Sequence, residues 1–596
     1  MAKYYANERS VLLLVALLKA HNIKKIIASP GTTNLSFVAS LQSDSFFEIY
    51  SCVDERSAAY MACGLSAETG EPVVITCTGA TASRNYPSGL TEAFYRKLPV
   101  LAITGTQDEN KIGHLHSQVI DRSVIPNDVV RFSTHIHATR DDEEARYNVI
   151  KINQAINELF RNGGGPVHIN LHTTYTRDFS VKTLPAVRAI HTVGYNDVDR
   201  FPDLPKGRIA IFVGSHHTFT KELTQAVDEF CAANDAVVFC DNTSGYYGKY
   251  RFNYALLGSQ QRTEYTQINV LDLCIHLGEI SAEYASLGKI VRKNVWRVSP
   301  DGELRDQFNA LSYVFQLDEL DFLRYYTPQQ YEEKKTYLEQ CLSLDKHIRE
   351  KLPEIPFSNV WIASRLYDKI PSGSALHFGV LNSIRSWNMF QLPTDITTFA
   401  NVGGFGIDGG VSSLIGASLA NPQKLYFGVF GDLAFFYDMN SIGNRHVGNN
   451  VRILIVNNGR GQEFRNHYHT GSIFGDDADK YISAAGHFGG QSPKLLRDYA
   501  ENLGFKYISA SNKDEFESVY QRFLSPEIGD CPIVFECFTD TNDECNSTKA
   551  FWNIEKDVKN AAINSVINAF GGKQALRKIL GPSGVKFFRR LLNKRT

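Results

Sequence analysis

Two short polar motifs in the last third of the chain have the residue types of a metal-diphosphate site. GDLAFFYDMN places Asp432 directly after an apolar run, and VRILIVNNGRGQEF places Asn457 and Asn458 after the next one. If the two runs are neighbouring parallel strands joined by a helix, a carboxylate and a carboxamide lie at the same edge of a sheet. Hard oxygen ligands of this kind suit Mg2+, which usually shares its coordination with phosphates. The motifs therefore predict a Mg-diphosphate site.

Each motif also has a simpler interpretation, since Gly-Asp can be a helix-capping turn and Asn-Asn an ordinary loop. A second functional interpretation comes from GFGIDG, where Gly404, Gly406 and Gly409 fit a dinucleotide-binding fingerprint and Asp432 could bind a ribose. That interpretation needs a full strand before the glycines, where only TTFAN stands, and it gives the Asn-Asn pair no task. A Rossmann oxidoreductase is kept as an alternative.

Both motifs, with their flanks, resemble the signature of thiamin diphosphate (ThDP) enzymes, and most closely the SEPHCHC synthase family of the menaquinone pathway, over most of residues 5 to 540. The resemblance implies that Asp432, the side chain of Asn458 and the backbone carbonyl of Arg460 bind Mg2+. The residues that it implies for ThDP binding are Asn85, Gly406, Ile407, Asp432, Leu433, Ala434, Asn458, Gly461, Gln462 and Phe464. Ile407 would be the apolar wedge over which the cofactor bends, although plain core packing is the alternative.

A candidate catalytic acid lies in CVDERSAAYMACG, where Glu55 opens a predicted helix. ThDP chemistry needs one carboxyl group against the aminopyrimidine ring, and by resemblance that group is Glu55. An acidic residue that merely stabilises a first helical turn is the alternative. We expect Ala58, Ala59, Ala62 and Gly64 to form a close-packing face of this helix. Gln118 matches the family's polar residue at the reaction centre and is the second catalytic candidate.

The predicted substrate pocket departs from the family, which holds two acids, 2-oxoglutarate and isochorismate, with several arginines and a lysine. Thr33, Gln107 and Val402 stand at arginine positions and Tyr284 at the lysine position, while Arg385 matches a donor-side arginine. Each lost charge-assisted contact costs about 1.5 to 3 kcal/mol. We therefore expect a less acidic acceptor than isochorismate. The substrate candidates are Thr32, Gln107 and Arg385.

The resemblance thus implies a ThDP- and Mg-dependent enzyme that decarboxylates a 2-oxo acid and adds the resulting enamine to an acceptor. A simple 2-oxo acid decarboxylase, which protonates the same species, is one alternative. A catalytically silent cofactor-binding protein is another, because a protein can keep its fold and lose its catalytic activity.

The elements that must position these residues are short Val/Ile-rich runs that alternate with helical periods along the chain, a pattern typical of α/β proteins with buried parallel strands. Breaks in the pattern predict three successive doubly wound domains: residues 1–185 (pyrimidine-binding), 186–350 (central) and 351–545 (diphosphate-binding). A basic helical tail, 546–596, would follow.

Composition limits the other possibilities. With 43% apolar residues, the 596-residue chain can bury several cores, and a net charge of -2 argues against nucleic-acid binding. The ten cysteines show no metal-ligand spacing and favour a reducing compartment. The apolar run VLLLVALLKA is too short to cross a bilayer, so we expect a cytoplasmic protein.

Partners are predicted from the resemblance and from the tail. The family forms each active site from two subunits, which implies a homodimer or homotetramer. Residues 558–596 hold nine Lys/Arg and no acidic residue. GVKFFRRLLNKR separates apolar from basic positions on two helical faces. We expect this tail to dock on the acidic body or on a neighbouring subunit, or else to contact an anionic membrane or a partner enzyme.

Overall fold

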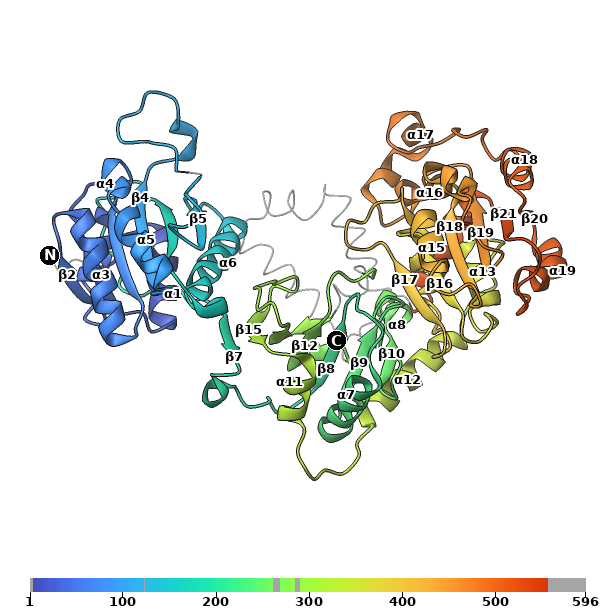
Figure 1. Ribbon diagram of the computed structural model, residues 1–596, viewed down its shortest axis with the longest axis horizontal. Coiled ribbons are helices and arrows are strands. Elements are labelled where there is room, and N and C mark those ends of the chain that lie inside the picture. Colours follow the sequence, from blue (N-terminus) through green and yellow to red (C-terminus); the bar gives the residue numbers. More distant parts are fainter. Residues whose placement is uncertain (1–3, 123, 261–267, 284–289, 556–596) are drawn as a thin grey trace, which may run out of the picture. The chain divides into compact units, whose positions relative to one another are not determined.

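The computed structural model describes residues 4–122, 124–260, 268–283 and 290–555. The chain forms two compact units, one that runs to Asp203 and also holds Val295–Asp318, and one that holds Leu204–Asn294 and continues from Glu319. Within each unit, the described pairings of the large sheets are parallel, and helices alternate with the strands (Figure 1). The predicted α/β class with several parallel-sheet domains is confirmed. The boundaries at 185 and 350 stay predictions.

The first unit is built on a six-stranded sheet with the order β2-β1-β3-β4-β6-β5. Its strands are β1 (Lys25–Ala28), β2 (Glu48–Ser51), β3 (Val73–Thr78), β4 (Val100–Thr106), β5 (Phe132–Ile136) and β6 (Val167–His172). Its helices are α1 (Arg9–Ala20), α2 (Leu35–Gln42), α3 (Glu55–Thr69), α4 (Thr81–Arg84), α5 (Pro87–Tyr95) and α6 (Asp142–Glu158).

Two cores cover the opposite faces of this sheet. Leu101 and Ile103 of β4 pack into the core that includes α1 and α6, and Val100 and Ala102 pack into the core of α3 and α5. Successive strand residues point to opposite faces, so a continuous apolar run fills both cores. The sheet is therefore doubly wound, and its strand ends carry the loops.

Helix α3 packs closely on α5, because a side chain at Gly89 would place its Cβ 2.5 Å from that of Ala59. Ala58, Ala59 and Ala62 are buried as expected. The expectation for Gly64 is wrong, since Gly64 is exposed with open space around it. The buried positions continue from Ala62 to Cys63, and Gly64 falls off that face of the helix.

The strands of the middle of the chain belong to both units. The order β10-β9-β8-β12 occurs in the second unit and β14-β15-β7 in the first. The second-unit strands are β8 (Ile209–Val213), β9 (Val237–Cys240), β10 (Arg251–Asn253) and β12 (Leu273–Leu277). The first-unit strands are β7 (His191–Gly194), β14 (Val295–Val298) and β15 (Leu311–Gln316). Helices α7 (Lys221–Asn234), α8 (Ala255–Ser259), α11 (Glu319–Tyr326) and α12 (Thr336–Arg349) lie in the second unit.

A further six-stranded sheet, β17-β16-β18-β19-β21-β20, positions the metal-diphosphate motifs in the second unit. Its strands are β16 (Ala375–Phe378), β17 (Thr397–Ala400), β18 (Tyr426–Gly431), β19 (Val451–Asn457), β20 (Lys506–Ala510) and β21 (Ile533–Phe538). The helices of this part include α13 (Asn359–Leu366), α14 (Asn382–Trp387), α15 (Gly410–Ser418), α16 (Asp432–Tyr437), α18 (Leu495–Asn502), α19 (Lys513–Phe523) and α20 (Thr541–Trp552).

Several sequence expectations concern other parts of the chain. The basic tail, apart from its first residues up to Glu555, and Tyr284 lie outside the described residues. All ten cysteines are free thiols. Among the described helices, none combines the length and the apolar character needed to cross a bilayer.

Candidate active site

Asp432 and Asn457 lie at the ends of adjacent parallel strands. β18 and β19 pair in register from Tyr426 and Val451 to Gly431 and Val456, so Asp432 and Asn457 follow at the same edge. Asp432 is the first residue of α16, and its Oδ2 accepts a hydrogen bond of 3.1 Å from the Gly459 N–H. The carboxylate thus faces the loop that begins at Asn458.

The environment of Asp432 fits a cation. The side chain is buried, and backbone N–H groups rather than basic side chains surround it. Burial raises the pKa of Asp432 to about 7 despite hydrogen bonds from the backbone at Leu433 and Gly459. A buried carboxylate without a cationic partner is costly, and a bound Mg2+ would supply the missing charge.

The loop after β19 carries two further candidate oxygen ligands, the Asn458 side chain and the Arg460 carbonyl. Asn458 Oδ1 accepts a hydrogen bond from the Arg460 N–H at 3.2 Å. The N–H of the preceding residue, Gly459, donates to Asp432. The Arg460 side chain forms an ion pair with Asp479 at 2.6 Å, which holds the loop. Asp432 therefore contacts the loop that carries Asn458 and Arg460, and the assignment of these three residues to Mg2+ stays a prediction.

Asn457 has a different task from its neighbour. Its Nδ2 donates to Glu536 Oε1 at 2.7 Å, and Tyr507 donates to the other oxygen at 2.6 Å. Glu536 is fully buried on β21, and burial raises its pKa above its ordinary value. Asn457 thus anchors the end of β19 to the adjacent strand, and Asn458 is the residue left for a metal.

The remaining diphosphate-side candidates follow this loop or line α16. Leu433 and Ala434 are half-buried in the first turn of α16, and Leu433 Cδ2 lies 3.4 Å from the position of a Cβ at Gly461. Gln462 is buried and donates to the Thr541 carbonyl at 3.1 Å, so it braces the loop from inside. Phe464 packs edge-on against His469 with ring centroids 5.1 Å apart.

The glycine-rich segment GFGIDG lies between β17 and α15. Gly406 is exposed and Ile407 half-buried, so both remain accessible to a ligand. β17 has four residues and lies at the edge of its sheet. Val402, at a family arginine position, is buried.

Arg385 forms an ion pair with Glu463, an acidic residue that the motifs did not indicate. Its Nη1 lies 2.6 and 2.7 Å from the two carboxylate oxygens of Glu463 and 3.2 Å from the Tyr468 hydroxyl. Arg385 and Glu463 are both largely buried, with side chains 19% and 15% exposed. Within the described residues, Nη2 and Nε of Arg385 make no hydrogen bond. The sequence feature that could have indicated this ion pair is the acidic residue within NNGRGQEF.

The pyrimidine-side candidates belong to the first unit. Glu55 is the first residue of α3 and is half-buried, and Asp54 caps the helix through the Ser57 N–H at 3.0 Å. Glu55 lies close enough to Cys77 and Tyr86 to influence the pKa of both groups. Burial is the main reason why both pKa values are raised. A carboxyl group at the rim of this core is accessible and partly desolvated.

The other first-unit candidates occupy loops after strands β1, β3 and β4. Thr32 and Asn85 are exposed, and Gln118 is exposed with φ +64°. Gln107 is half-buried, donates to the Tyr175 hydroxyl at 3.0 Å and accepts from Lys111 at 2.8 Å. Because the strands are parallel, these loops share the carboxyl edge of the sheet with Glu55.

Thr33 stands at a position where the family has arginine and has a structural role here. It is buried and its hydroxyl contacts Thr78 and the Gly105 carbonyl, the latter at 2.7 Å. Thr33 therefore ties together the ends of three strands and offers no charge to a ligand.

Comparison with known proteins agrees with this geometry. Residues 11–125 match the family described as "Thiamine pyrophosphate enzyme, N-terminal TPP binding domain". The 2-succinyl-5-enolpyruvyl-6-hydroxy-3-cyclohexene-1-carboxylate synthase of Bacteroides thetaiotaomicron is 30% identical over 563 residues, which cover 92% of this chain and 99% of the relative. The enzyme of that name from Bacteroides fragilis is 29% identical over 564 residues, with the same coverage. That of Christiangramia forsetii is 25% identical over 599 residues, covering 89% and 96%.

Fold, site and comparisons together define a ThDP-dependent enzyme of the α/β class. The chain belongs to the 2-succinyl-5-enolpyruvyl-6-hydroxy-3-cyclohexene-1-carboxylate (SEPHCHC) synthase family. It uses ThDP and Mg2+ to decarboxylate a 2-oxo acid and to join the product to an acceptor through a new C–C bond. The resemblance, the reaction class and the cofactors predicted from the motifs are confirmed, and the dinucleotide interpretation is set aside.

Proposed function

We propose that Asp432, Asn458 and the Arg460 carbonyl hold the Mg2+ that binds the cofactor's diphosphate, and that Glu55 holds the proton shared with its pyrimidine ring. When bound, ThDP supplies the electron sink for decarboxylation and carboligation. The protein would orient it: Ile407 would lie against the bound cofactor, and Leu433, Ala434, Gly461 and Gln462 would shape the loop at its diphosphate. The position of the buried Asp432 carboxylate, which accepts from the Gly459 N–H in the loop between Asn458 and Arg460, is the observation that supports the metal assignment.

The donor subsite is where we propose that this chain differs from its relatives. The family resemblance places Arg385 on the donor side, where it would bind a carboxylate or a similar anion of the 2-oxo acid. Glu463 neutralises its charge, however, and a second carboxylate on the donor would lie beside the carboxylate of Glu463. The pair offers N–H donors from Nη2 and Nε and acceptor oxygens from Glu463. We therefore propose a donor with a neutral hydrogen-bonding group, such as a hydroxyl or an amide, at this end.

The acceptor side is likewise less basic than an acid-binding site requires. Gln107 is held by Tyr175 and Lys111, Thr33 is internal, and Val402 is buried. The exposed Thr32 and Gln118 add neutral polar groups there, and Lys111, bound to Gln107, is a basic residue that the described chain shows beside these candidates. We propose an acceptor with fewer carboxylates than isochorismate.

The test is a two-way substrate screen with enzyme loaded with ThDP and Mg2+. Donors are 2-oxo acids that end in a methyl, hydroxyl, amide or second carboxylate group, and CO2 release is measured for each. Candidate aldehyde and enone acceptors are then added and products identified by mass spectrometry. The proposal expects the neutral polar donors to be used best and a C–C-linked product to form. CO2 release with only a protonated product would make the chain a simple decarboxylase. Cofactor binding without CO2 release from any donor would support the silent alternative.

Oligomeric assembly is typical of ThDP enzymes, and we propose a homodimer or homotetramer in which Glu55 of one copy serves the cofactor held by Asp432 of another. The outer face of α3 supports this. Next to Glu55 it exposes Tyr60, Met61 and Gly64, and Val53 precedes it. Apolar side chains around a small residue suit close helix packing between subunits.

We also propose a cytoplasmic location, supported by ten free cysteines. For the basic tail we propose docking on the acidic body, with an anionic membrane or a partner protein as the alternative. Truncation after Asp557, compared with the full chain in vesicle co-sedimentation and oligomeric state, separates these roles. If the truncated protein sediments with vesicles as the full chain does, the tail does not anchor the protein to a membrane. If truncation abolishes the oligomer, the tail docks on the protein itself.

A further inference from the structure

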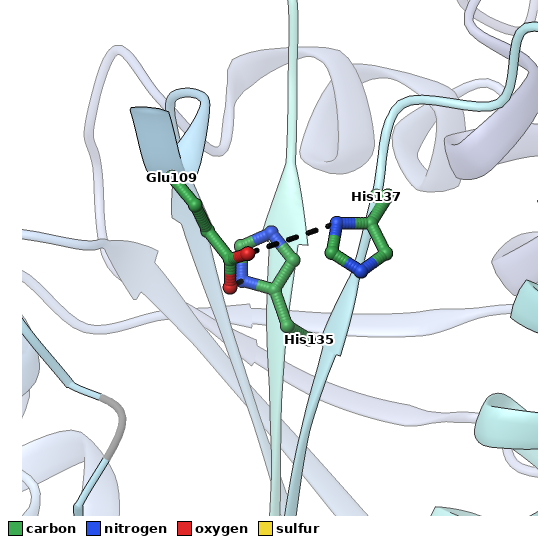
Figure 2. Close-up of side chains that lie close together, drawn as sticks. All are labelled: Glu109, His135 and His137. Carbon is green, nitrogen blue, oxygen red and sulfur yellow. Dashed lines mark ion pairs between the residues drawn. The ribbon is translucent and has the colours of Figure 1, made fainter. Parts of the chain in front are cut away.

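Two histidines and a glutamate converge at the carboxyl edge of the first sheet, on the side of its edge strand β5. His135 lies near the end of β5, and His137 follows directly after the strand. Glu109 begins η1 (Glu109–Lys111), the short 3-10 helix after β4. Residues two apart along a strand point to the same face, so both imidazoles reach the side from which Glu109 approaches (Figure 2).

The carboxylate of Glu109 faces the Nδ1 atoms of both rings, whose centroids are 4.7 Å apart. Its Oε1 is 2.9 Å from His135 Nδ1 and its Oε2 is 3.9 Å from His137 Nδ1 (Figure 2). One ligand-type atom from each of the three residues lies within 4.8 Å of the other two. In a tetrahedral zinc site with bonds of about 2.0 to 2.1 Å, ligand atoms are about 3.3 Å apart. The observed separations lie on both sides of that value, so small side-chain rotations would close the site.

We propose that Glu109, His135 and His137 form a binding site for a divalent transition-metal ion of the zinc type. Two imidazoles and one carboxylate are a common three-ligand set for such ions, with the remaining position open to water or a ligand. The side chains of His137 and Glu109 are 44% and 47% exposed, so the ion has an entry path. Mg2+ prefers all-oxygen coordination, which distinguishes this site from the one at Asp432.

The immediate contacts of His135 leave its Nδ1 available to a metal. The side chain is 13% exposed, and Nδ1 faces Glu109 Oε1. Nδ1 also lies 2.9 Å from Asn170 Nδ2. Coordination through Nδ1 would replace this contact, while Asn170 stays held through its oxygen by Arg122 and by Thr104. Asp108, itself paired with Arg140 at 3.5 Å, adds negative potential nearby.

The ion would join two segments that are far apart in sequence. Glu109 lies two residues after Gln107, at the start of the connection between β4 and β5 that also carries Gln118. A bond from Glu109 to β5 would fix the start of this connection. The proposed ion is therefore structural, and it restrains the segment that bears two candidate substrate-side residues.

The experiment uses untagged full-length protein saturated with ThDP and excess Mg2+. Zn2+ is titrated in competition with a chromophoric chelator, and Co2+ is added to separate samples for visible spectroscopy. His137→Gln and Glu109→Gln are the test variants, because both side chains are partly exposed and outside the core. His446→Gln, at an exposed histidine of the second unit, is the matched control.

We expect wild type and H446Q to bind one Zn2+ tightly, with a Co2+ spectrum of nitrogen and oxygen ligands. H137Q and E109Q should each lose at least about tenfold in Zn2+ affinity. Zn2+ should also raise the melting temperature of wild type more than that of either variant. Failure of wild type to bind Zn2+, unchanged affinity in both variants, or thiolate-to-cobalt charge-transfer bands would each overturn the proposal.

Discussion

The two carboxylate oxygens of Glu463 lie 2.6 and 2.7 Å from one guanidinium nitrogen of Arg385, which makes a single anionic side chain the main partner of the donor-side arginine. Tyr468 contacts both residues, at 3.2 Å from Arg385 and 3.3 Å from Glu463. An arginine that a protein neutralises in this way differs chemically from one that waits for a substrate carboxylate.

Replacing Glu463 by Gln should change donor preference. The freed guanidinium can form charge-assisted hydrogen bonds of about 1.5 to 3 kcal/mol with an anion. We expect kcat/KM for 2-oxoglutarate to rise at least about tenfold relative to a neutral donor. The control is Glu517→Gln, which removes the surface partner of Arg365 and should leave the ratio unchanged. An unchanged ratio in E463Q would show that the pair does not read the donor.

Arg385→Ala tests the same subsite by removing the other residue of the ion pair. It should raise the KM of the donor far more than that of the acceptor, because only the donor would meet this residue. Steady-state kinetics with each substrate varied in turn checks this. Equal effects on both KM values would mean that Arg385 only supports the fold around Glu463.

Glu55→Gln should retain ThDP binding and lose at least about a hundredfold in turnover, because the amide preserves packing but cannot exchange the shared proton. Glu68→Gln, an exposed position on the same helix, is the matched control. Cofactor affinity by calorimetry and turnover by CO2 release are measured on both. Activity of E55Q within a few-fold of wild type would remove Glu55 from the mechanism.

Asp432→Ala and Asp432→Asn should both abolish Mg-dependent ThDP binding, since each removes the anionic ligand. Asn keeps the shape of a side chain whose charge is costly when buried, so cofactor-free D432N should melt no lower than wild type. Calorimetric titration and thermal unfolding separate loss of the site from loss of the fold. ThDP affinity like that of wild type in D432N would place the metal elsewhere.

Tyr60→Glu on the exposed face of α3 should weaken subunit association, because a buried charge at an apolar interface is unfavourable. Light scattering after size exclusion should show a shift toward monomer, with activity falling in parallel. Tyr331→Glu, at another exposed tyrosine, should change neither. A wild-type monomer that is fully active at micromolar concentration would contradict the shared-site proposal.

Most of the strands that are buried on both faces could be predicted from the sequence, whereas the edge strands β5 and β20 could not. Runs such as PVVITCTG and VRILIVNN became β3 and β19, because a strand buried on both faces must be apolar throughout. β5, with the sequence FSTHI, and β20, with KYISA, are half-exposed at sheet edges and lack such a run. This is also why a site that uses His135 on β5 had no sequence signal.

The positions of Asp432 and Asn457 at the ends of adjacent strands could be predicted from the sequence, because strand ends and their polar residues are local features. Glu463 and the internal role of Thr33 required the fold, since each depends on partners far away in sequence. Arg385 precedes Glu463 by 78 residues. The sequence did not show which face of α3 carries Gly64, because small residues suit both buried contacts within a subunit and exposed positions that can contact another subunit.

The most direct test of the account is CO2 release from a panel of 2-oxo acids by purified protein, with ThDP and Mg2+ each omitted in turn and D432N in parallel. We expect at least one donor to release CO2. This release should require both ThDP and Mg2+ and should be absent in D432N. Release that is independent of ThDP, or activity retained by D432N, would contradict it.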